Sequence, residues 1–288
     1  MKLLIIGCNG QLGSDMVLLA RAAGHEVAGI DFPEIDITDL DGVRRKVGES
    51  RCDGIVNCAG YTAVDACETH EKEAYAVNAH GAGNLARCAA ETGISIIHIS
   101  TDYVFDGSKT SPYIETDTPN PQSAYGRSKL DGERQVAAAN PRHQIFRIAW
   151  LYGIKGANFV KTIRKVAAEK AHAGEPLKVV NDQRGTPTYT REVCRQILRV
   201  LPEAAYGIFH CTAEGECTWY DFACRIVAAA KVGARVIPCA TAEFPRPACR
   251  PANSVLENAR LKSLGLNVMK DWKEGFADFI SDEARENG

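Results

Sequence analysis

The stretch "KLLIIGCNGQLG", residues 2–13, decides the fold of this chain. Its first half is an apolar run typical of a buried strand, and residues 12–23 carry apolar side chains at helical spacing. Three glycines lie between the two at every third position: Gly7, Gly10 and Gly13. Glycines in a turn from strand to helix let the backbone approach a pyrophosphate, which then sits at the helix N-terminus. The stretch therefore predicts a dinucleotide-binding turn; close packing of helix on strand is the other interpretation.

An acidic residue, Asp31, ends the second predicted strand, residues 26–31. A carboxylate there can accept hydrogen bonds from a ribose 2'-hydroxyl and would repel a 2'-phosphate. The sequence therefore favours NADH over NADPH, although nearby loop residues could still admit the phosphate. We expect Asp36 and Ile37, in "DIT" at 36–38, beside the adenine, unless Asp36 only caps the next helix.

The first half of the chain alternates apolar runs with amphipathic helices. After the second strand, the predicted elements are a helix near 39–48, a strand at 53–60, a long helix near 70–91, a strand at 94–100, a helix near 123–139 and a strand at 144–150. Strands separated by helices imply crossover connections and a parallel sheet covered on both faces. We therefore predict an α/β fold, with a Rossmann-like doubly wound parallel sheet in residues 1–150.

Beyond residue 150, proline and glycine interrupt this pattern. The predicted elements are a helix near 190–201, a strand near 207–211, a helix from Trp219 and a loop over 244–254. We predict that residues 151–288 form mainly a smaller C-terminal α/β lobe that binds substrate, with some elements returning to the sheet.

Composition narrows the class of partner. The 288 residues are 45% hydrophobic and 24% charged, as in ordinary globular proteins, and the net charge is -2. Such a charge gives no electrostatic reason to expect nucleic acid or an anionic membrane as a partner. No apolar run approaches the ~18 residues of a membrane span. The eleven cysteines include no C-x-x-C pair, which favours buried thiols of a cytoplasmic protein over disulfides or a zinc site.

The segment "SAYGRSKLDGE", residues 123–133, places Tyr125 and Lys129 four positions apart on one helical face. Reduction of a ketone needs a hydride and a proton, and a tyrosine is a good proton donor when its pKa falls toward neutrality. A lysine ammonium within ~4–6 Å lowers a tyrosine pKa. Thr101, at the end of the fourth strand, can hydrogen-bond the carbonyl. The alternatives are a Thr101 that only caps a loop and a Tyr125 that only packs on the sheet.

Nearly the whole chain resembles the dTDP-4-dehydrorhamnose reductase family of the extended short-chain dehydrogenase/reductase superfamily. The matching segments are "GCNGQLG", "DITD", "VNCAGYTAVDACE", "NAHGAGNLA", "STDYVFDG", "YGRSKLDGE", "WLYG…NF", "NDQRGTPT" and "RPANSVL". The resemblance implies a reductase that transfers hydride from NAD(P)H to the C4 ketone of dTDP-4-dehydro-L-rhamnose. Two departures are modest: Gly60 stands where alanine is common, and Glu257 replaces an aspartate.

The resemblance also implies roles for single residues. It assigns the cofactor pyrophosphate to Gly10, Gln11 and Leu12, and the nicotinamide side to Gly60, Tyr61 and Thr62. Asn78 matches an asparagine that helps organise the active-site proton path, and the resemblance places Asn78, Tyr125 and Lys129 among the cofactor-binding residues. Thr101 takes the place of a catalytic serine, with Asp102 beside it, and Trp150 matches a substrate-contacting tryptophan.

Other expectations are less specific. The guanidinium fork of Arg250 suits the substrate diphosphate, or it is a solvated loop charge. Some family members bind Mg²⁺ at a dimer contact, so magnesium and a homodimer are possible, but the sequence places no ligands.

Two other functions stay open at this point. One is a non-catalytic regulatory subunit resembling that of methionine adenosyltransferase, although an intact Thr101, Tyr125 and Lys129 argues against it. The other is a sugar-nucleotide epimerase or dehydratase. Dehydratases often carry Asp-Glu after the strand-four threonine, whereas here Asp102 and Tyr103 follow it.

Overall fold

The opening stretch folds as a strand, a glycine turn and a helix. In the computed structural model, which describes residues 1–287, β1 (Lys2–Ile6) leads through the turn into α1 (Gln11–Ala22). Alternate side chains of a strand face opposite sides of the sheet. Accordingly, Leu3 and Ile5 belong to one apolar core, and Leu4 and Ile6 belong to another on the opposite face.

Six parallel strands form the main sheet, in the order β10-β5-β4-β3-β1-β2. The other five strands are β2 (Glu26–Ile30), β3 (Gly54–Asn57), β4 (Ser95–Thr101), β5 (His143–Ile148) and β10 (Gly207–His210). The strand order reverses at β1, because β2 lies on one side of it and β3 on the other. Ligands of such sheets bind outside the carboxyl ends of the strands at this reversal. The predicted doubly wound parallel fold is confirmed.

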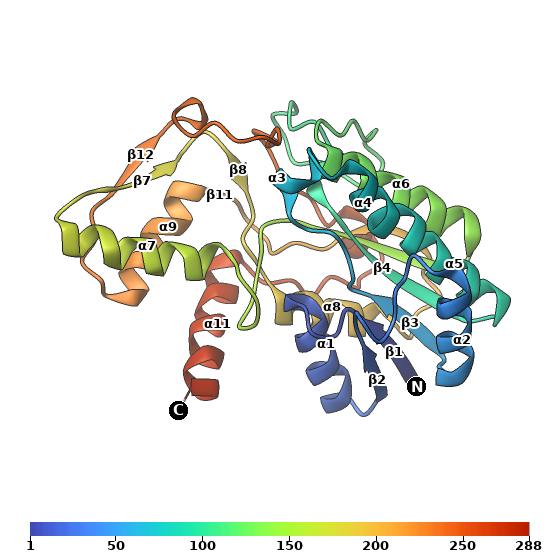
Figure 1. Cartoon of the computed structure of the whole chain (residues 1–288). Coiled ribbons are helices and arrows are strands. Elements are labelled where there is room, and N and C mark those ends of the chain that lie inside the picture. The colour runs from blue at the N-terminus through green and yellow to red at the C-terminus, as the bar shows by residue number, and fades with distance from the viewer. Residues whose placement is uncertain (288) are drawn as a thin grey trace.

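Helices cover both faces of the sheet (Figure 1). One face carries α1 and α8 (Thr190–Val200), which pack against each other. The opposite face carries α2 (Leu40–Ser50), α5 (Ala82–Glu91) and α6 (Ala124–Ala139). The helix α6 is the one that carries "YGRSKLDGE".

Three predicted elements differ in the structure, and the simplest difference is that the strand expected at 53–60 ends at Asn57. The long helix near 70–91 is divided into α4 (Glu71–Tyr75), the π-helical turn η1 (Ala76–Gly81) and α5. Apolar periodicity does not reveal a π turn, which inserts extra residues without breaking the helix and often marks functional sites. The strand expected at 144–150 ends at Ile148, because Trp150 has a left-handed backbone with φ of 47°.

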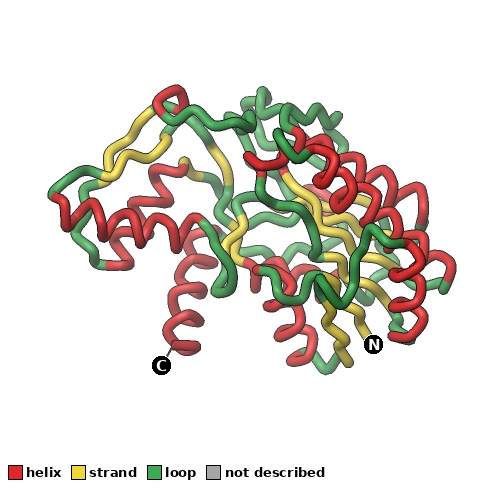
Figure 2. Tube along the Cα trace, viewed as in Figure 1, coloured by secondary structure: helices red, strands yellow, loops and turns green. Residues whose placement is uncertain are grey.

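The second half of the chain builds a lobe beside the sheet (Figure 2). Its helices are α7 (Phe159–Ala173), α9 (Trp219–Ala230) and α11 (Trp272–Asn287). Its short strand pairs are β7 (Leu177–Val180) with β12 (Val236–Cys239), β8 (Arg184–Gly185) with β11 (Cys217–Thr218), and β6 (Leu151–Tyr152) with β9 (Thr188–Tyr189). The remaining short elements of the chain are α3 (Val64–Cys67), η2 (Asp102–Val104), η3 (Thr241–Glu243) and α10 (Ala259–Ser263).

The lobe and the sheet share parts of the chain. From the second half, α8 packs on the main sheet and β10 pairs with β5 at its edge. Most lobe elements, including the helix α7, were not predicted. The lobe strands are only two to four residues long and pair across distant positions, so they leave little periodic signal. The division at residue 150 stays a prediction.

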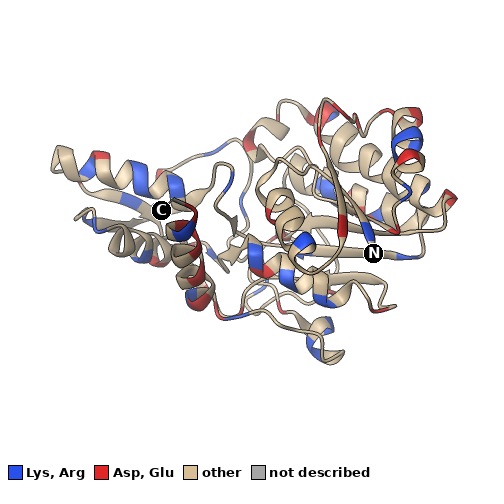
Figure 3. Cartoon of the chain, turned by 90° about the horizontal axis from the view of Figure 1, so that it is seen from below, with Lys and Arg blue, Asp and Glu red and all other residues tan. Residues whose placement is uncertain are grey.

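Charges of both signs are spread over the helices, consistent with the near-zero net charge (Figure 3). Within residues 1–287, no helix is both long and apolar enough to cross a membrane. All eleven cysteines are free thiols, and most are buried.

Candidate active site

A cavity of about 630 Å³ opens at the carboxyl ends of the sheet strands. Of the residues predicted for the site, those that line it are Gly7, Gly10, Gln11, Leu12, Asp31, Asp36, Ile37, Gly60, Thr62, Thr101, Asp102, Tyr125, Lys129 and Trp150. Four others lie outside this lining: Gly13, Tyr61, Asn78 and Arg250. The fold therefore brings the glycine turn and the Tyr-Lys pair to one cavity.

Two glycines of the turn, Gly7 and Gly13, stand where a side chain would have no room. Gly7 has φ of 77°, and a Cβ there would lie 2.7 Å from the backbone nitrogen of Ala59. A Cβ on Gly13 would lie 2.7 Å from the carbonyl carbon of Gly7, so Gly13 lets α1 pack closely behind the turn. Gly10 is the N-cap of α1 and faces the cavity. This backbone cradle at a helix N-terminus fits a pyrophosphate.

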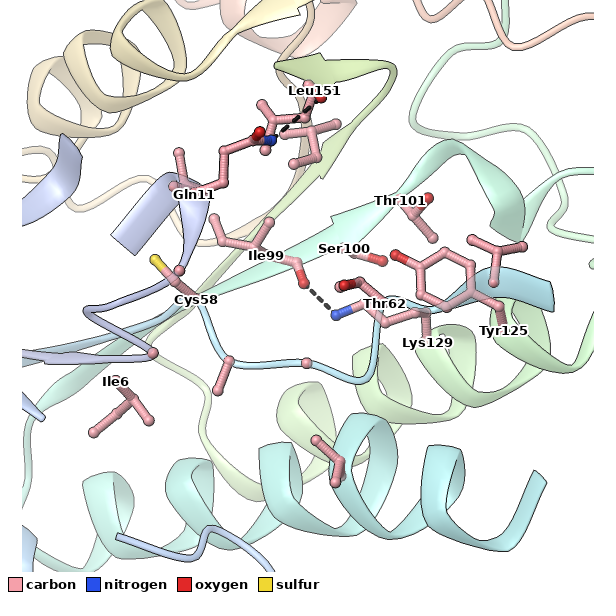
Figure 4. A pocket seen from close by; sticks show the side chains of 18 of the residues that line it. Ile6, Gln11, Cys58, Thr62, Ile99, Ser100, Thr101, Tyr125, Lys129 and Leu151 are labelled. Atoms are coloured by element: carbon pink, nitrogen blue, oxygen red, sulfur yellow. Dashed lines mark hydrogen bonds between the residues drawn. The ribbon is translucent and has the colours of Figure 1, made fainter. Parts of the chain in front are cut away.

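The side chain of Gln11 links the turn to the lobe. Its Nε2 donates to the carbonyl of Leu151 at 3.3 Å, a bond drawn in Figure 4. Its Oε1 accepts a hydrogen bond from Nδ2 of Asn158, the N-cap of α7, at 2.9 Å. The amide of Gln11 is thus engaged in holding the lobe against the turn.

The two acidic residues predicted to lie near the adenine and its ribose differ in their bonds. Asp31 follows β2 directly, and its Oδ2 accepts from the backbone N–H of Asn9 in the glycine turn at 2.9 Å. Asp36 accepts from the backbone N–H and the hydroxyl of Thr38, and so closes a local turn. Both still line the cavity, so a local bond and a ligand contact are compatible at Asp36.

Asn78 sits in the π turn η1 and anchors the loop after β3. Its Oδ1 accepts from the Tyr61 backbone N–H at 2.8 Å, and its Nδ2 donates to the Tyr61 carbonyl at 3.1 Å. It also donates to Oγ of Ser128 on α6 at 3.0 Å. These bonds hold Gly60 and Thr62 at the cavity while the Asn78 side chain stays behind the loop.

The Tyr-Lys pair points into the cavity from α6 (Figure 4). Both residues are buried; the Lys129 ammonium donates to the Ile99 carbonyl at 2.5 Å. Thr101, the last residue of β4, donates from Oγ1 to Asp102 Oδ1 at 2.9 Å and accepts from the Tyr103 backbone N–H. Thr101 therefore caps the η2 turn and also faces the cavity, but its single hydroxyl proton would have to leave Asp102 to reach a substrate carbonyl.

The expected lowering of the Tyr125 pKa by Lys129 is wrong for this structure. Burial, with the charge of Asp102 second, raises the pKa of Tyr125 above its ordinary value, against a hydrogen bond with Thr101. Burial also lowers the pKa of Lys129 to about 8 and raises that of Asp102 to about 6. The Tyr125 hydroxyl is therefore protonated at neutral pH, which is the form that donates a proton, although a raised pKa also makes it a weaker acid.

Trp150 and Arg250 occupy different surroundings. Trp150 lines the cavity between β5 and β6. Both terminal nitrogens of Arg250 donate to the carboxylate of Asp65 at 2.9 Å, which holds the loop at 244–254 against α3. Its role as a diphosphate ligand therefore stays a prediction.

Comparison with known proteins identifies the family. The protein-family model described as "RmlD substrate binding domain" matches residues 1–285 of this chain. A dTDP-4-dehydrorhamnose reductase of Mycolicibacterium smegmatis is 40% identical over 286 residues, covering 97% of this chain and 85% of that one. The chain belongs to the dTDP-4-dehydrorhamnose reductase family.

Solved structures agree with this assignment. The crystal structure of a dTDP-4-dehydrorhamnose reductase from Clostridium acetobutylicum is 46% identical, with a TM-score of 0.94 and coverage of 98% of this chain and 99% of that one. The enzyme from Bacillus anthracis, solved in complex with NADP, is 35% identical, with a TM-score of 0.93 and the same coverage. The fold of this dTDP-4-dehydrorhamnose reductase family member is thus that of its relatives throughout.

Several groups at the site of this family member escaped the sequence analysis. The carbonyl of Ile99 accepts the Lys129 ammonium, Cys58 lines the cavity, and the ring of Tyr103 meets that of Tyr125 edge-on at 5.5 Å. A backbone carbonyl carries no residue signal. Tyr103 could have been found, since it follows Asp102 directly after the fourth strand.

A buried ionic network lies behind the cavity and also escaped prediction. Glu133, one turn beyond Lys129 on α6, accepts from the Ser100 hydroxyl at 2.5 Å and from Arg147 at 2.9 and 2.7 Å. The network ties α6 to β4 and β5. The charge of Glu133 also raises the pKa of Lys129, which partly opposes the effect of burial.

The lowered pKa of Lys129 predicts a pH-dependent stability. Between pH 8 and 10.5 the unfolded chain keeps a proton on Lys129 that the folded chain has released, so the unfolding free energy rises with pH there. We expect wild type to gain about 1–3 kcal/mol over Lys129→Met across this window. Urea unfolding of both proteins at pH 7.5 and 10 measures this difference. Ionisation of the cysteine thiols and tyrosines is common to both proteins and cancels in the comparison. An unfolding free energy of wild type that does not rise relative to that of Lys129→Met between these two pH values would contradict this.

Proposed function

We propose that this protein transfers hydride from NAD(P)H to the C4 ketone of dTDP-4-dehydro-L-rhamnose and forms dTDP-L-rhamnose. The observation that carries the proposal is the single cavity shared by the glycine turn and by Thr101, Tyr125 and Lys129. The names of the close relatives support the same reaction. The family relatives give no support to a regulatory subunit or to an epimerase or dehydratase.

The cavity has residues suited to a nicotinamide cofactor along its length. The turn at Gly7, Gly10, Gln11 and Leu12 would hold the pyrophosphate, with Gly13 packed behind it. Asp31 would face the adenine ribose, with Asp36 and Ile37 beside the adenine. Gly60 and Thr62 would border the nicotinamide, on a loop fixed through Tyr61 by Asn78. When bound, the cofactor supplies the hydride.

The chain's own residues would manage the proton. Tyr125 would donate its phenolic proton to the developing C4 alkoxide, and Thr101 would donate to the same oxygen once its hydroxyl proton turns away from Asp102. Lys129, which retains a proton below pH about 8, stabilises the tyrosinate that remains and binds the nicotinamide ribose. Asp102 and Trp150, which line the cavity, would border the sugar, and Arg250 would reach the diphosphate if its pair with Asp65 opened.

Two finer expectations concern assembly and metal. A homodimer stays a proposal, as does a Mg²⁺ ion at a contact between copies. Within residues 1–287, no three or more His, Cys, Asp or Glu side chains of one chain gather as a metal site. We therefore assign no magnesium ligand.

The proposed reaction is tested with a substrate panel. Oxidation of NADH and of NADPH is followed at 340 nm with dTDP-4-dehydro-L-rhamnose, with its unepimerised precursor sugar, and with the same keto sugars on other nucleotides. We expect the first to give the highest kcat/KM. Oxidation with none of them, or tightly bound NAD⁺ that does not exchange, would contradict the proposal.

The lean toward NADH makes a separate prediction at Asp31. Asp31→Asn keeps an acceptor for the Asn9 N–H but removes the negative charge. The ratio of kcat/KM for NADH to that for NADPH should then fall about tenfold, as expected from removing one repulsive charge near a phosphate. Asp41→Asn, an exposed site on α2, serves as the matched control. An unchanged ratio in Asp31→Asn would remove this residue from cofactor choice.

A further inference from the structure

The conformation of Trp150 is unusual for its size. Its φ of 47° lies in the left-handed region, which bulky residues adopt at a cost of roughly 1–2 kcal/mol. Such backbone strain persists where the surroundings fix it, and it is concentrated at functional sites. Trp150 lies between β5 of the sheet and β6 of the lobe. Its left-handed conformation turns the indole away from the direction of β5 and toward the lobe.

The lobe holds one face of this indole. The rings of Trp150 and Trp219 stack with centroids 3.4 Å apart and planes 9° apart. Trp219 is itself fixed: it is the first residue of α9, after Thr218, whose side chain forms a capping box with Asp221. Phe159, the first residue of α7, packs on Trp219 with centroids 4.4 Å apart. The stack is therefore built on the starts of two lobe helices.

A glycine clears space for the same indole. A Cβ on Gly185 would lie 2.6 Å from Nε1 of Trp150 and closer still to Cε2. The backbone of Gly185 does not have a positive φ, so its conformation alone would accept alanine. Gly185 pairs with Cys217 in the β8–β11 ladder, two residues before Trp219. The glycine of "NDQRGTPT" and the start of α9 therefore form one seat for Trp150.

We propose that Trp219 and Gly185 are positioning residues that hold the Trp150 indole as the wall of the sugar half of the cavity. The inference rests on the proposed function, since it assumes that Trp150 borders the sugar. An aromatic face is a suitable wall for the C–H face of a deoxy sugar, and its placement decides which sugars fit. Neither residue lines the cavity itself, so both act through Trp150.

The test separates positioning from general damage. In Gly185→Ala and Trp219→Leu, the KM for the keto sugar should rise about 10- to 100-fold, as expected from a wall misplaced by about 1 Å. The Kd for NADH should change less than about twofold, since the cofactor half of the cavity is untouched. Trp219→Phe keeps an aromatic face and should restore a KM near wild type. Gly48→Ala, on α2 where a Cβ meets nothing within 4 Å, is the matched control.

A second measurement does not depend on activity. Stacked indoles give an exciton-coupled circular dichroism signal at the long-wavelength edge of the far ultraviolet, and the chain has only three tryptophans. Gly185→Ala keeps all three but should lose the signal that Trp219→Phe also loses, while Gly48→Ala keeps it. Wild-type KM in both Gly185→Ala and Trp219→Leu would overturn the proposal, as would an unchanged spectrum of Gly185→Ala. Failure of the wild type to reduce any keto sugar would instead overturn the proposed function, and the spectra would still decide whether Gly185 seats the indole.

Discussion

Tyr125→Phe is expected to lower kcat by about 10²- to 10⁴-fold, the usual contribution of a positioned proton donor. The substitution removes one oxygen from a buried ring and keeps its edge-on contact with Tyr103. Because burial raises the pKa of Tyr125, the wild-type hydroxyl is protonated throughout the neutral range and is able to donate. Ionisation of the Tyr125 hydroxyl itself should therefore add no pH dependence to this loss between pH 6 and 8. Single-turnover oxidation of bound NADH measures the chemical step.

Cofactor binding provides the control for this variant. The Kd for NADH should stay within about fivefold of wild type, since Lys129 and the glycine turn are unchanged and one hydrogen bond contributes about 1 kcal/mol. Tyr206→Phe, at the opposite end of the sheet near Met1 and Asp53, makes the same chemical change away from the cavity. Wild-type turnover in Tyr125→Phe would remove its hydroxyl from the mechanism.

The parts of the fold and site that depend on local sequence patterns could be predicted from the sequence. A buried strand, three glycines and a helix determine the turn at residues 7–13, and the carboxyl ends of parallel strands then bring Asp31, Gly60 and Thr101 to one edge. Helical spacing placed Tyr125 and Lys129 on one face. None of these inferences required knowledge of a distant contact.

Properties that depend on residues far apart in the sequence could not be predicted. The pKa of Tyr125 depends on burial and on Asp102, which helical spacing does not reveal. The backbone of Trp150 leaves the strand direction at a position seated by Gly185 and Trp219, from parts of the chain read as a turn and a helix start. A motif can therefore name a site residue while leaving its electrostatics and orientation undetermined.

Removing the carboxylate of Glu133 is expected to destabilise the protein by about 3–5 kcal/mol, because the buried Arg147 guanidinium loses its partner. The two side chains are 3% and 2% exposed, and Nη1 of Arg147 already has no hydrogen-bond partner in the described structure. Urea unfolding of Glu133→Ala measures the effect. The matched control is Glu71→Ala, which breaks a 3.0 Å pair with Arg127 on the same helix α6. Both side chains of the Glu71–Arg127 pair are well exposed, so Glu71→Ala should lower the unfolding free energy by less than about 1 kcal/mol.

The double variant Glu133→Leu with Arg147→Met separates the two consequences of this network. Replacing a buried ion pair by apolar side chains is often neutral, so most of the lost stability should return. The charge beside Lys129 does not return, and its pKa should fall below the wild-type value of about 8. The rise of unfolding free energy with pH should then begin at a lower pH than in wild type. If stability recovers but the pH at which the unfolding free energy rises does not shift, Glu133 holds α6 in place without acting on the pKa of Lys129. If the double variant is as unstable as Glu133→Ala, the packing of the two side chains, and not their charge balance, holds α6 on the sheet.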